Sequence, residues 1–448
     1  MQGIKPERSP DLSLPLRYMI AALAAFVFFS TGVPLVAPTF LKTYDGPHIF
    51  SLIHLAVLGW ITMIMMGALY QLFPVALQAE IHSVRLGKWN FWLFAGGVAG
   101  FVPSFFVWWT PGIAIFGTLA VAGVIHFVAN MARSYASVKV WNAMAYYVLC
   151  ALGWLTLTVL AGFVYAFDEV FHWFDISPNI LAAHVHLGLA GWFSLTLMGV
   201  SYKLMAMFSL AHGHDETLAK GNLVLWNLGL IGLALSLVVV PHSAYVVIFA
   251  LVLDASATIF VIDMILLFRR RRRRAVSLMQ WHAFISFASV LVASAMGVLL
   301  AAGHPLTPNW VVAYGYVALV GWLGFSIIGK YYKIIPFLLW VHRYSKQIGS
   351  GPVPLLKDMM DERWGYVSLI GLFVGYVTVL AGIVSPSLTA VRVGGGIFAL
   401  GSYVFAYNIC RVFGAKASSR KQVEDGRLPL PPHLKARLLR RRAGREAS

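Results

Sequence analysis

The sequence predicts an all-α membrane protein, a bundle of about twelve transmembrane helices built as three pseudo-repeats of four. Three observations lead to this fold class. Of the 448 residues, 59% are hydrophobic and 11% are charged, whereas soluble domains carry charge on about a quarter of their residues. The hydrophobic residues fall in runs of about 20, the length that a helix needs to cross a bilayer. Finally, one glycine–tryptophan motif recurs three times along the chain.

The glycine, proline and charged residues that interrupt the hydrophobic runs set the bounds of each expected helix. Residues 1–16 form a polar N-terminal tail, and residues 414–448 form a basic C-terminal tail. The membrane domain therefore covers 17–413. In chain order, its predicted spans are 17–41, 48–76, 90–109, 111–131, 140–166, 178–208, 221–240, 243–268, 280–301, 309–340, 365–386 and 390–413.

Basic residues alternate between successive loops. If the N-terminus is cytoplasmic, the run Arg269–Arg274 and most other loop lysines and arginines lie inside, whereas only Lys42 and Arg392 lie outside. This distribution follows the positive-inside rule and predicts a multi-pass protein of a bacterial-type inner (plasma) membrane with both tails cytoplasmic. The net charge of +17 at pH 7 is then a topology signal beside anionic lipid. We expect the lipid bilayer, not nucleic acid, to be the partner of these residues.

The recurring motif is G-W, six residues, G, two residues, Y. Its tryptophans are Trp60, Trp192 and Trp322, which are 132 (192 − 60) and 130 (322 − 192) residues apart. Each copy falls on the second span of a four-span unit, which is the basis for predicting three repeats. The glycines permit close helix packing, and the Trp and Tyr side chains can pack or anchor at the membrane interface.

Three histidines lie within predicted spans, in the half expected to face outside: His54, His184 and His186. Ionisable residues inside a membrane are costly and usually have a function. His54 and His186 share one repeat position, which Tyr316 takes in the third repeat, and Tyr314 matches His184. Neutral imidazole is a common axial ligand of haem iron, so we expect these five residues to form a haem site. The alternative is that the histidines are packed or hydrogen-bonded core residues.

Two constraints limit this site. Residues two apart on a helix point about 200° apart. His184 and His186 therefore face different neighbours, and only one of them can join His54 across a haem plane, while the other serves a second site or a hydrogen bond. The two cysteines, Cys150 and Cys410, form no CxxCH motif, so the haem is expected to be non-covalently bound haem b.

Other side chains within the spans suggest a weaker proton pathway and allow a copper ion. Polar residues inside a membrane can relay protons, although lysines near helix ends usually extend to the surface. The candidates for the pathway are Asp254, Lys203, Lys333 and His126. Methionine sulfur can bind copper, although methionines more often fill gaps in a core. The candidates for copper are Met63, Met65 and Met66.

These features resemble a known family. The twelve-span layout and the segment His184-Val-His186, followed by Leu-Gly-Leu-Ala-Gly-Trp, are similar to subunit I of the haem–copper oxidases and nitric oxide reductases. The cbb3-type branch is nearest. In this family an H-x-H segment supplies haem ligands, and His54 matches the low-spin haem ligand of the second helix. The resemblance therefore implies an oxidase-like bundle that holds haem near its outer face.

The sequence departs from this family at the copper centre. The family carries H-x-H on the tenth helix, whereas this chain has it on the sixth and places Tyr314 and Tyr316 on the tenth. The seventh span, 221–240, contains no histidine, although the oxidases have a copper-ligating pair there. The resemblance thus implies a haem site without a complete oxygen-reducing haem–copper centre.

Three functions are consistent with these observations. The first is a haem b-binding membrane protein in electron transfer, nitric oxide or haem handling, or respiratory-complex assembly. Its partners would be other respiratory-chain subunits or a small redox protein. The second is a transporter or channel for metal ions or protons that uses the same intramembrane polar residues. The third is an assembly partner without a cofactor.

Overall fold

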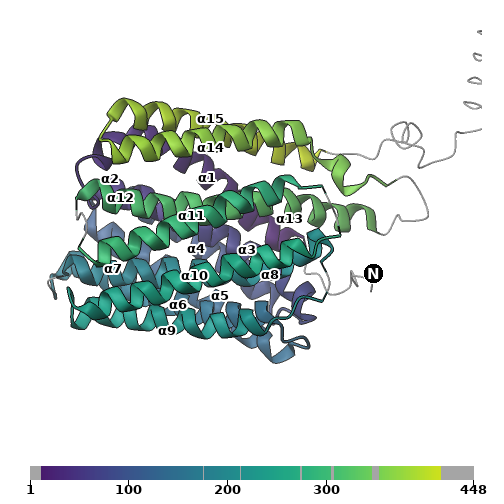
Figure 1. The fold of residues 1–448 in the computed structure, drawn as a ribbon, viewed down its shortest axis with the longest axis horizontal. Helices are drawn as coiled ribbons and strands as arrows, with labels where there is room; N and C mark the ends of the chain where they lie inside the picture. The colour runs from purple at the N-terminus through teal and green to yellow at the C-terminus, as the bar shows by residue number, and fades with distance from the viewer. Residues whose placement is uncertain are drawn as a thin grey trace, which may run out of the picture.

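The computed structural model describes residues 12–174, 176–211, 213–272, 275–303, 307–345 and 353–414. These residues form a bundle of long helices that run side by side (Figure 1). Most of the predicted N-terminal tail 1–16, and nearly all of the basic tail 414–448, lie outside the described residues. The all-α class predicted from the sequence is confirmed.

Three of the long helices are continuous rods with a π-helical segment in the middle, and the others are α-helical throughout. We name the three rods inner helix 1 (α2 Pro47–His54, η2 Leu55–Thr62, α3 Met63–Leu77), inner helix 2 (α7 Pro178–His186, η4 Leu187–Ser194, α8 Leu195–Ser209) and inner helix 3 (α12 Pro308–Tyr316, η5 Val317–Gly324, α13 Phe325–Tyr344). The remaining long helices are α1 Ser13–Phe40, α4 Val84–Phe106, α5 Thr110–Ser134, α6 Ala143–Phe171, α9 Thr217–Val239, α10 Ala244–Arg269, α11 Leu278–Ala301, α14 Glu362–Val384 and α15 Leu388–Phe413.

Eleven of these helices are long and apolar enough to cross a membrane. The twelfth predicted span, 90–109, is the helix α4, which has the required length but is not among the eleven. Its tryptophans, glycines and Asn90 make it less apolar than its neighbours. The chain is therefore a multi-pass membrane protein in a lipid bilayer, with eleven candidate spans in its described residues.

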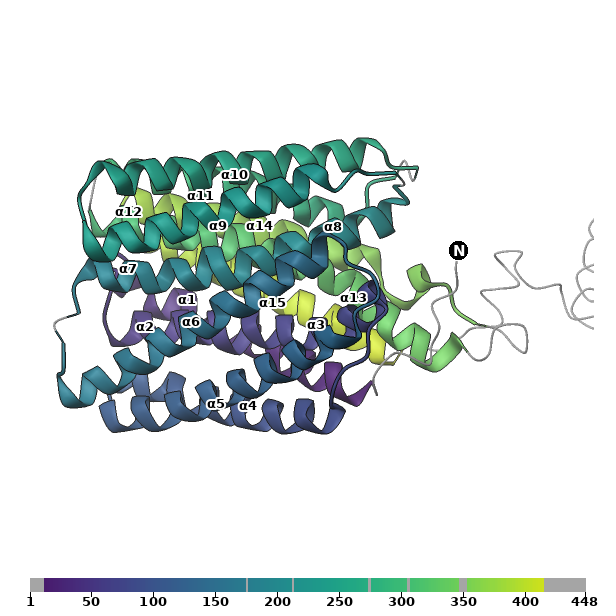
Figure 2. The same ribbon diagram turned by 90° about the horizontal axis from the view of Figure 1, so that it is seen from below.

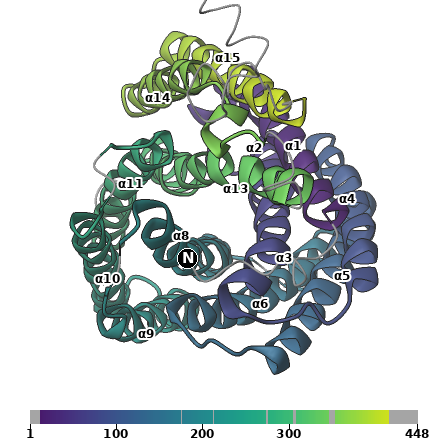
Figure 3. The same cartoon turned by 90° about the vertical axis from the view of Figure 1, so that its right-hand side faces the viewer.

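The three inner helices occupy the centre of the bundle. Viewed end-on, α3, α8 and α13 lie in the interior of the bundle (Figure 3). Helices α9, α10 and α11 flank them on one side, and α4, α5 and α6 flank them on the other. In their most apolar 18-residue stretches, 67%, 56% and 78% of the residues of inner helices 1, 2 and 3 are buried, against 33–44% in the other eight spans. Most side chains in these stretches of the inner helices therefore face protein rather than lipid.

Each π-helical segment begins directly after a residue of the predicted site. The segments start at Leu55, Leu187 and Val317, immediately after His54, His186 and Tyr316. Their starts are 132 (187 − 55) and 130 (317 − 187) residues apart. π-Helical turns are rare and are frequent at functional sites.

Tryptophans join the inner helices to one another in a ring. Trp192 Nε1 donates a hydrogen bond to Thr62 Oγ1 at 3.3 Å, which joins inner helix 2 to inner helix 1. Trp322 Nε1 donates to Ser194 Oγ at 2.9 Å, which joins inner helix 3 to inner helix 2. A Cβ at Gly324 would lie 3.0 Å from the indole of Trp60, so a tryptophan also lies at the contact between inner helices 3 and 1. We call these three side chains the tryptophan layer.

The bundle has two distinct ends. The inner helices begin at Pro47, Pro178 and Pro308 at the end that carries the histidines, which we call the histidine end (Figure 2). They finish at the opposite end, where the loop after α10 carries the arginine run, and we call this the basic end.

Candidate functional site

His54 lies at the end of the first α-helical part of inner helix 1, and its ring is half-buried between aromatic side chains. Its imidazole stacks on Phe105 of α4, with ring centroids 4.8 Å apart, and meets the edge of Phe101 at 5.3 Å. Its Nδ1 donates a hydrogen bond to the Phe50 carbonyl oxygen at 2.7 Å. This bond fixes the tautomer, so that Nε2 carries the lone pair. Nε2 makes no hydrogen bond to any described residue and is free to bind a ligand.

His184 lies on inner helix 2, at the same end of the bundle as His54. The edge of the His184 ring meets Tyr165 of α6, at a centroid distance of 5.3 Å. Its Nδ1 is buried without a hydrogen-bond partner among the described residues. Gly162 of α6 makes room for this ring, because a Cβ there would lie 3.2 Å from His184 Cε1.

His186 points toward inner helix 3 instead. Its Nδ1 donates to the Ala182 carbonyl oxygen at 2.7 Å, and the Tyr314 hydroxyl donates to its Nε2 at 3.0 Å. The His186 and Tyr314 rings are stacked, with centroids 6.0 Å apart. The prediction that His184 and His186 face different neighbours is therefore confirmed. His186 is already hydrogen-bonded, whereas His54 and His184 have nitrogens available.

The tyrosines of inner helix 3 have two different environments. Tyr314 belongs to the pair with His186 and packs beside Gly297 of α11. Tyr316 is 8% exposed and stacks on Tyr376 of α14, with ring centroids 5.5 Å apart. Its hydroxyl has no partner among the described residues. The five predicted site residues thus lie at one end of the bundle, and His186 and Tyr314 contact each other, whereas His54, His184 and Tyr316 each contact an aromatic residue of an outer helix.

The residues of the predicted proton pathway are dispersed. Asp254 of α10 accepts a hydrogen bond from Ser294 of α11 at 2.6 Å. His126 is exposed on α5 and donates only to the Ala122 carbonyl oxygen. Lys203 is half-buried on inner helix 2, and the Lys333 ammonium lies 5.9 Å from the centre of the Phe208 ring. A route through these residues remains a prediction.

The methionines predicted as copper ligands lie in the packed core. Met63, Met65 and Met66 are each at most 4% exposed. Within the described residues, no group of three or more His, Cys, Asp or Glu side chains is placed to hold a metal ion.

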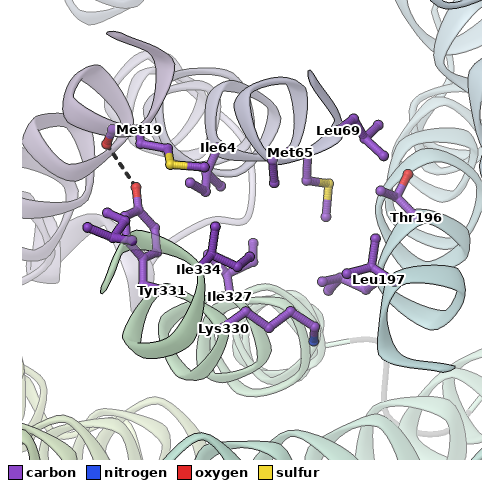
Figure 4. Close-up of a pocket in the computed structure, with 13 residues that line it drawn as sticks. Met19, Ile64, Met65, Leu69, Thr196, Leu197, Ile327, Lys330, Tyr331 and Ile334 are labelled. Carbon is purple, nitrogen blue, oxygen red and sulfur yellow. Dashed lines mark hydrogen bonds between the residues drawn. The ribbon is translucent and has the colours of Figure 1, made fainter. Parts of the chain in front are cut away.

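Sequence reasoning missed Lys330, which lies at the centre of the bundle. Its side chain extends from inner helix 3 toward inner helix 2, where Thr196 and Leu197 lie (Figure 4). Its Nζ donates to the hydroxyl of Ser326, one turn earlier on the same helix. The sequence did contain a signal for this lysine. At the positions that match Lys330 in the first two repeats, the residues are the apolar Ala68 and Val200.

Comparisons with known proteins give one partial match. No protein-family model matches the chain. Over 105 residues it is 30% identical to the Cbb3-type cytochrome c oxidase subunit CcoN1 of Stutzerimonas stutzeri. The aligned part covers 22% of this chain and 21% of that subunit, so the match spans about a fifth of the relative's length. The chain therefore has distant, partial homology to a haem–copper oxidase subunit I.

Proposed function

We propose that the chain is a haem b-binding integral membrane protein with a haem–copper oxidase subunit I-like fold, and that His54 and His184 are the axial ligands. The observation that carries this proposal is that two inner helices each place a histidine at the histidine end of the bundle, against aromatic rings of the outer helices. Neither ring has another side chain as hydrogen-bond partner. Pairs of neutral histidines are a common way to hold a b-type haem without covalent attachment.

The surroundings of the two histidines fit a haem. Bound haem supplies one-electron redox chemistry. The backbone bond from His54 orients its Nε2, which is the usual outer-shell support of a metal-ligating imidazole. Phe101, Phe105 and Tyr165 provide apolar aromatic walls that exclude water. The unpartnered Nδ1 of His184 indicates that this ring lacks an orienting partner in the protein alone.

We propose that this site serves electron transfer, nitric oxide or haem handling, or respiratory-complex assembly. The partial similarity to the cbb3-type subunit supports a respiratory setting, with other respiratory subunits or a small redox protein as partners. Two imidazoles saturate the axial positions of a haem iron, which suits electron transfer better than binding of a gas. The departures of the sequence from the oxidase copper centre support a role without oxygen reduction.

The three inner helices support a threefold pseudo-repeat within the bundle. The matching π-helical segments and the tryptophan layer relate them to one another. The second glycine of each motif, at 67, 199 and 329, also packs against the preceding outer helix in the same way. A Cβ at these glycines would lie 2.6, 2.7 and 2.7 Å from the Cβ atoms of Tyr18, Tyr147 and His282. Charge alternation in the loops supports the orientation with the basic end in the cytoplasm.

Haem content tests the proposal directly. Protein expressed with ample haem and purified in detergent should give the pyridine haemochrome spectrum of haem b. The transporter and the cofactor-free assembly partner both predict a haem-free protein. A monodisperse, folded preparation without haem would therefore refute the proposal and favour one of these alternatives.

A larger residue at Gly162 is expected to reduce haem binding. In Gly162→Leu the new side chain would occupy the space beside the His184 ring, since even a Cβ would lie 3.2 Å from it. Gly153→Leu on the same helix is the matched control, because a Cβ there meets nothing within 4 Å. The haem-to-protein ratio should fall in the first variant and stay at the wild-type value in the second. Equal ratios in both variants would argue against His184 as a ligand.

A further inference from the structure

At the basic end, asparagines of two outer helices hold the residues at which α4 and α14 begin. Ser83 is the N-cap of α4, and its backbone nitrogen donates a hydrogen bond to Asn130 Oδ1 of α5 at 3.0 Å. The Asn130 amide in turn donates to the Ser83 carbonyl oxygen at 2.9 Å. Asp361 is the N-cap of α14, and the Asn408 amide of α15 donates to its carbonyl oxygen at 3.1 Å. A neutral side chain therefore fixes the start of both helices.

At the matching position of the second repeat, an acid replaces the asparagine. The N-cap of α9 is Glu216, and the residue 47 positions later (263 − 216) is Asp263 of α10. The same separation of 47 residues relates each asparagine to the N-cap that it holds (130 − 83 and 408 − 361). Asp263 contacts His214, two residues before this N-cap, with 3.0 Å between Asp263 Oδ1 and His214 Nε2. Of these three contacts, only this one joins side chains that can both change charge.

The contact between Asp263 and His214 is buried and depends on charge. The Asp263 side chain is 2% exposed, and the His214 side chain is 12% exposed. Among the described residues, neither Asp263 Oδ2 nor His214 Nε2 makes a hydrogen bond of good geometry. The attraction is therefore mainly that of an imidazolium for a carboxylate. A buried carboxylate without a counter-charge is costly, so Asp263 needs His214 in its protonated form.

His214 is the group near this contact that changes charge around neutral pH. Its ring stacks on Tyr202, with ring centroids 6.4 Å apart. The ionisable side chains that face the pair, or hold the segment before α9, are Tyr202 of inner helix 2, Tyr147 of α6, Asp215, Glu216 and Lys220 at the start of α9, and Arg270 directly after α10. Phenols, carboxylates, ammonium and guanidinium groups ordinarily keep one charge state between about pH 5 and pH 8, whereas imidazole does not.

We infer that the contact between His214 and Asp263 is a pH-sensitive latch, which holds the segment 213–216 and the first turn of α9 against the basic end. While the imidazole is protonated, the charges attract and the latch is closed. When His214 loses its proton, the Asp263 carboxylate stays buried without a counter-charge, and water reaches it once the segment moves away. The latch is therefore closed at mildly acidic pH and opens as the pH rises. The inference does not require bound haem.

Hydrogen exchange of the full-length protein in detergent tests the latch. The informative amide is that of Lys220, which donates to the Glu216 carbonyl oxygen at 2.9 Å in the first turn of α9. The matched amide is that of Gly87, which donates to the Ser83 carbonyl oxygen at 3.1 Å in the first turn of α4. Each exchange rate is divided by the intrinsic rate at the same pH. Protection at Lys220 should fall between about pH 5 and pH 8, by at most about tenfold per pH unit for one proton. Protection at Gly87 should stay constant.

Two substitutions assign the pH dependence to this pair. Asp263→Asn introduces the neutral amide that the first and third repeats carry at this position, and His214→Gln removes the titrating ring from the less buried partner. Each should abolish the pH dependence at Lys220, and protection at Gly87 shows that the variant is folded. His82→Gln is the matched control, because His82 is exposed in the loop before α4 and should leave the pH dependence at Lys220 unchanged.

The inference is overturned if protection at Lys220 in the wild type does not change with pH. It is equally overturned if either folded variant, Asp263→Asn or His214→Gln, keeps the wild-type pH dependence.

Discussion

His54→Ala and His184→Ala are each expected to abolish the sharp reduced bands of a low-spin haem. In either variant one axial position would lose its imidazole, and a half-buried cavity replaces the ring. Removing an outer-shell partner already lowers metal affinity about 10–100-fold, so loss of a ligand itself should have a larger effect. The measurement is the dithionite-reduced minus oxidised absorbance spectrum, normalised to protein, for each purified variant.

Two further histidine variants make this comparison specific. His186→Ala should keep the bands, because His186 faces Tyr314 and not His54. His126→Ala should also keep them. His126 is exposed on α5 and, like His54, donates a hydrogen bond to a backbone carbonyl oxygen, but it is not part of the proposed site. If His186→Ala loses haem while His184→Ala retains it, the assignment of the second ligand is wrong. If both retain it, the haem lies elsewhere.

Gly97→Ala is expected to destabilise the bundle far more than the same change at the neighbouring glycine. A Cβ at Gly97 would lie 2.4 Å from the backbone nitrogen of Ala120 on α5, so the two helices would have to separate. At Gly96 the nearest atom would be the end of the Leu119 side chain, at 3.6 Å. Overpacking a core typically costs about 1–3 kcal/mol, and a clash with backbone relaxes less easily than one with a side chain.

The paired alanine variants isolate this contact from helix propensity. Alanine favours a helix over glycine by about 1 kcal/mol, and both variants gain this benefit. Thermal unfolding in detergent should therefore show Gly96→Ala at or above the wild-type midpoint and Gly97→Ala well below it. Equal midpoints would mean that α4 and α5 are not packed as closely as the structure has them.

Much of the bundle was predictable because a chain that crosses a membrane can adopt few backbone structures. Hydrophobic runs alone located the inner helices to within a few residues at most ends, since a span has to satisfy its backbone hydrogen bonds internally. The span 90–109 was placed less well, because α4 begins at Val84 and includes Arg85 and Lys88. Charges at the start of a helix resemble a loop when only hydropathy is considered.

The π-helical segments could not be predicted in this way. The residues 55–62, 187–194 and 317–324 are apolar except for Thr62 and Ser194, which end the first two segments, so their sequence fits either helical period. Hydrophobic periodicity distinguishes helix types only when one face is polar. The π-helical segments do fall at matching positions of the motif in the three inner helices.

The site was predicted in its residue types but not in its pairing. Helical geometry shows that His184 and His186 diverge, but not which neighbour each one meets. That choice follows from the position of inner helix 2 between inner helices 1 and 3, which only the packed bundle defines. Lys330 was missed for a similar reason. It lies ten residues from the end of the predicted span 309–340, and the sequence alone does not show that its side chain extends toward inner helix 2.

The most direct test of the proposed ligands is an electron paramagnetic resonance spectrum of the oxidised protein at low temperature. Two imidazoles on one iron predict a low-spin ferric signal in the wild type. Removing either His54 or His184 should convert the remaining haem to a high-spin signal, and His186→Ala should leave the low-spin signal in place. A folded wild-type protein without any haem signal, or a low-spin signal that survives both substitutions, would contradict a haem held by His54 and His184.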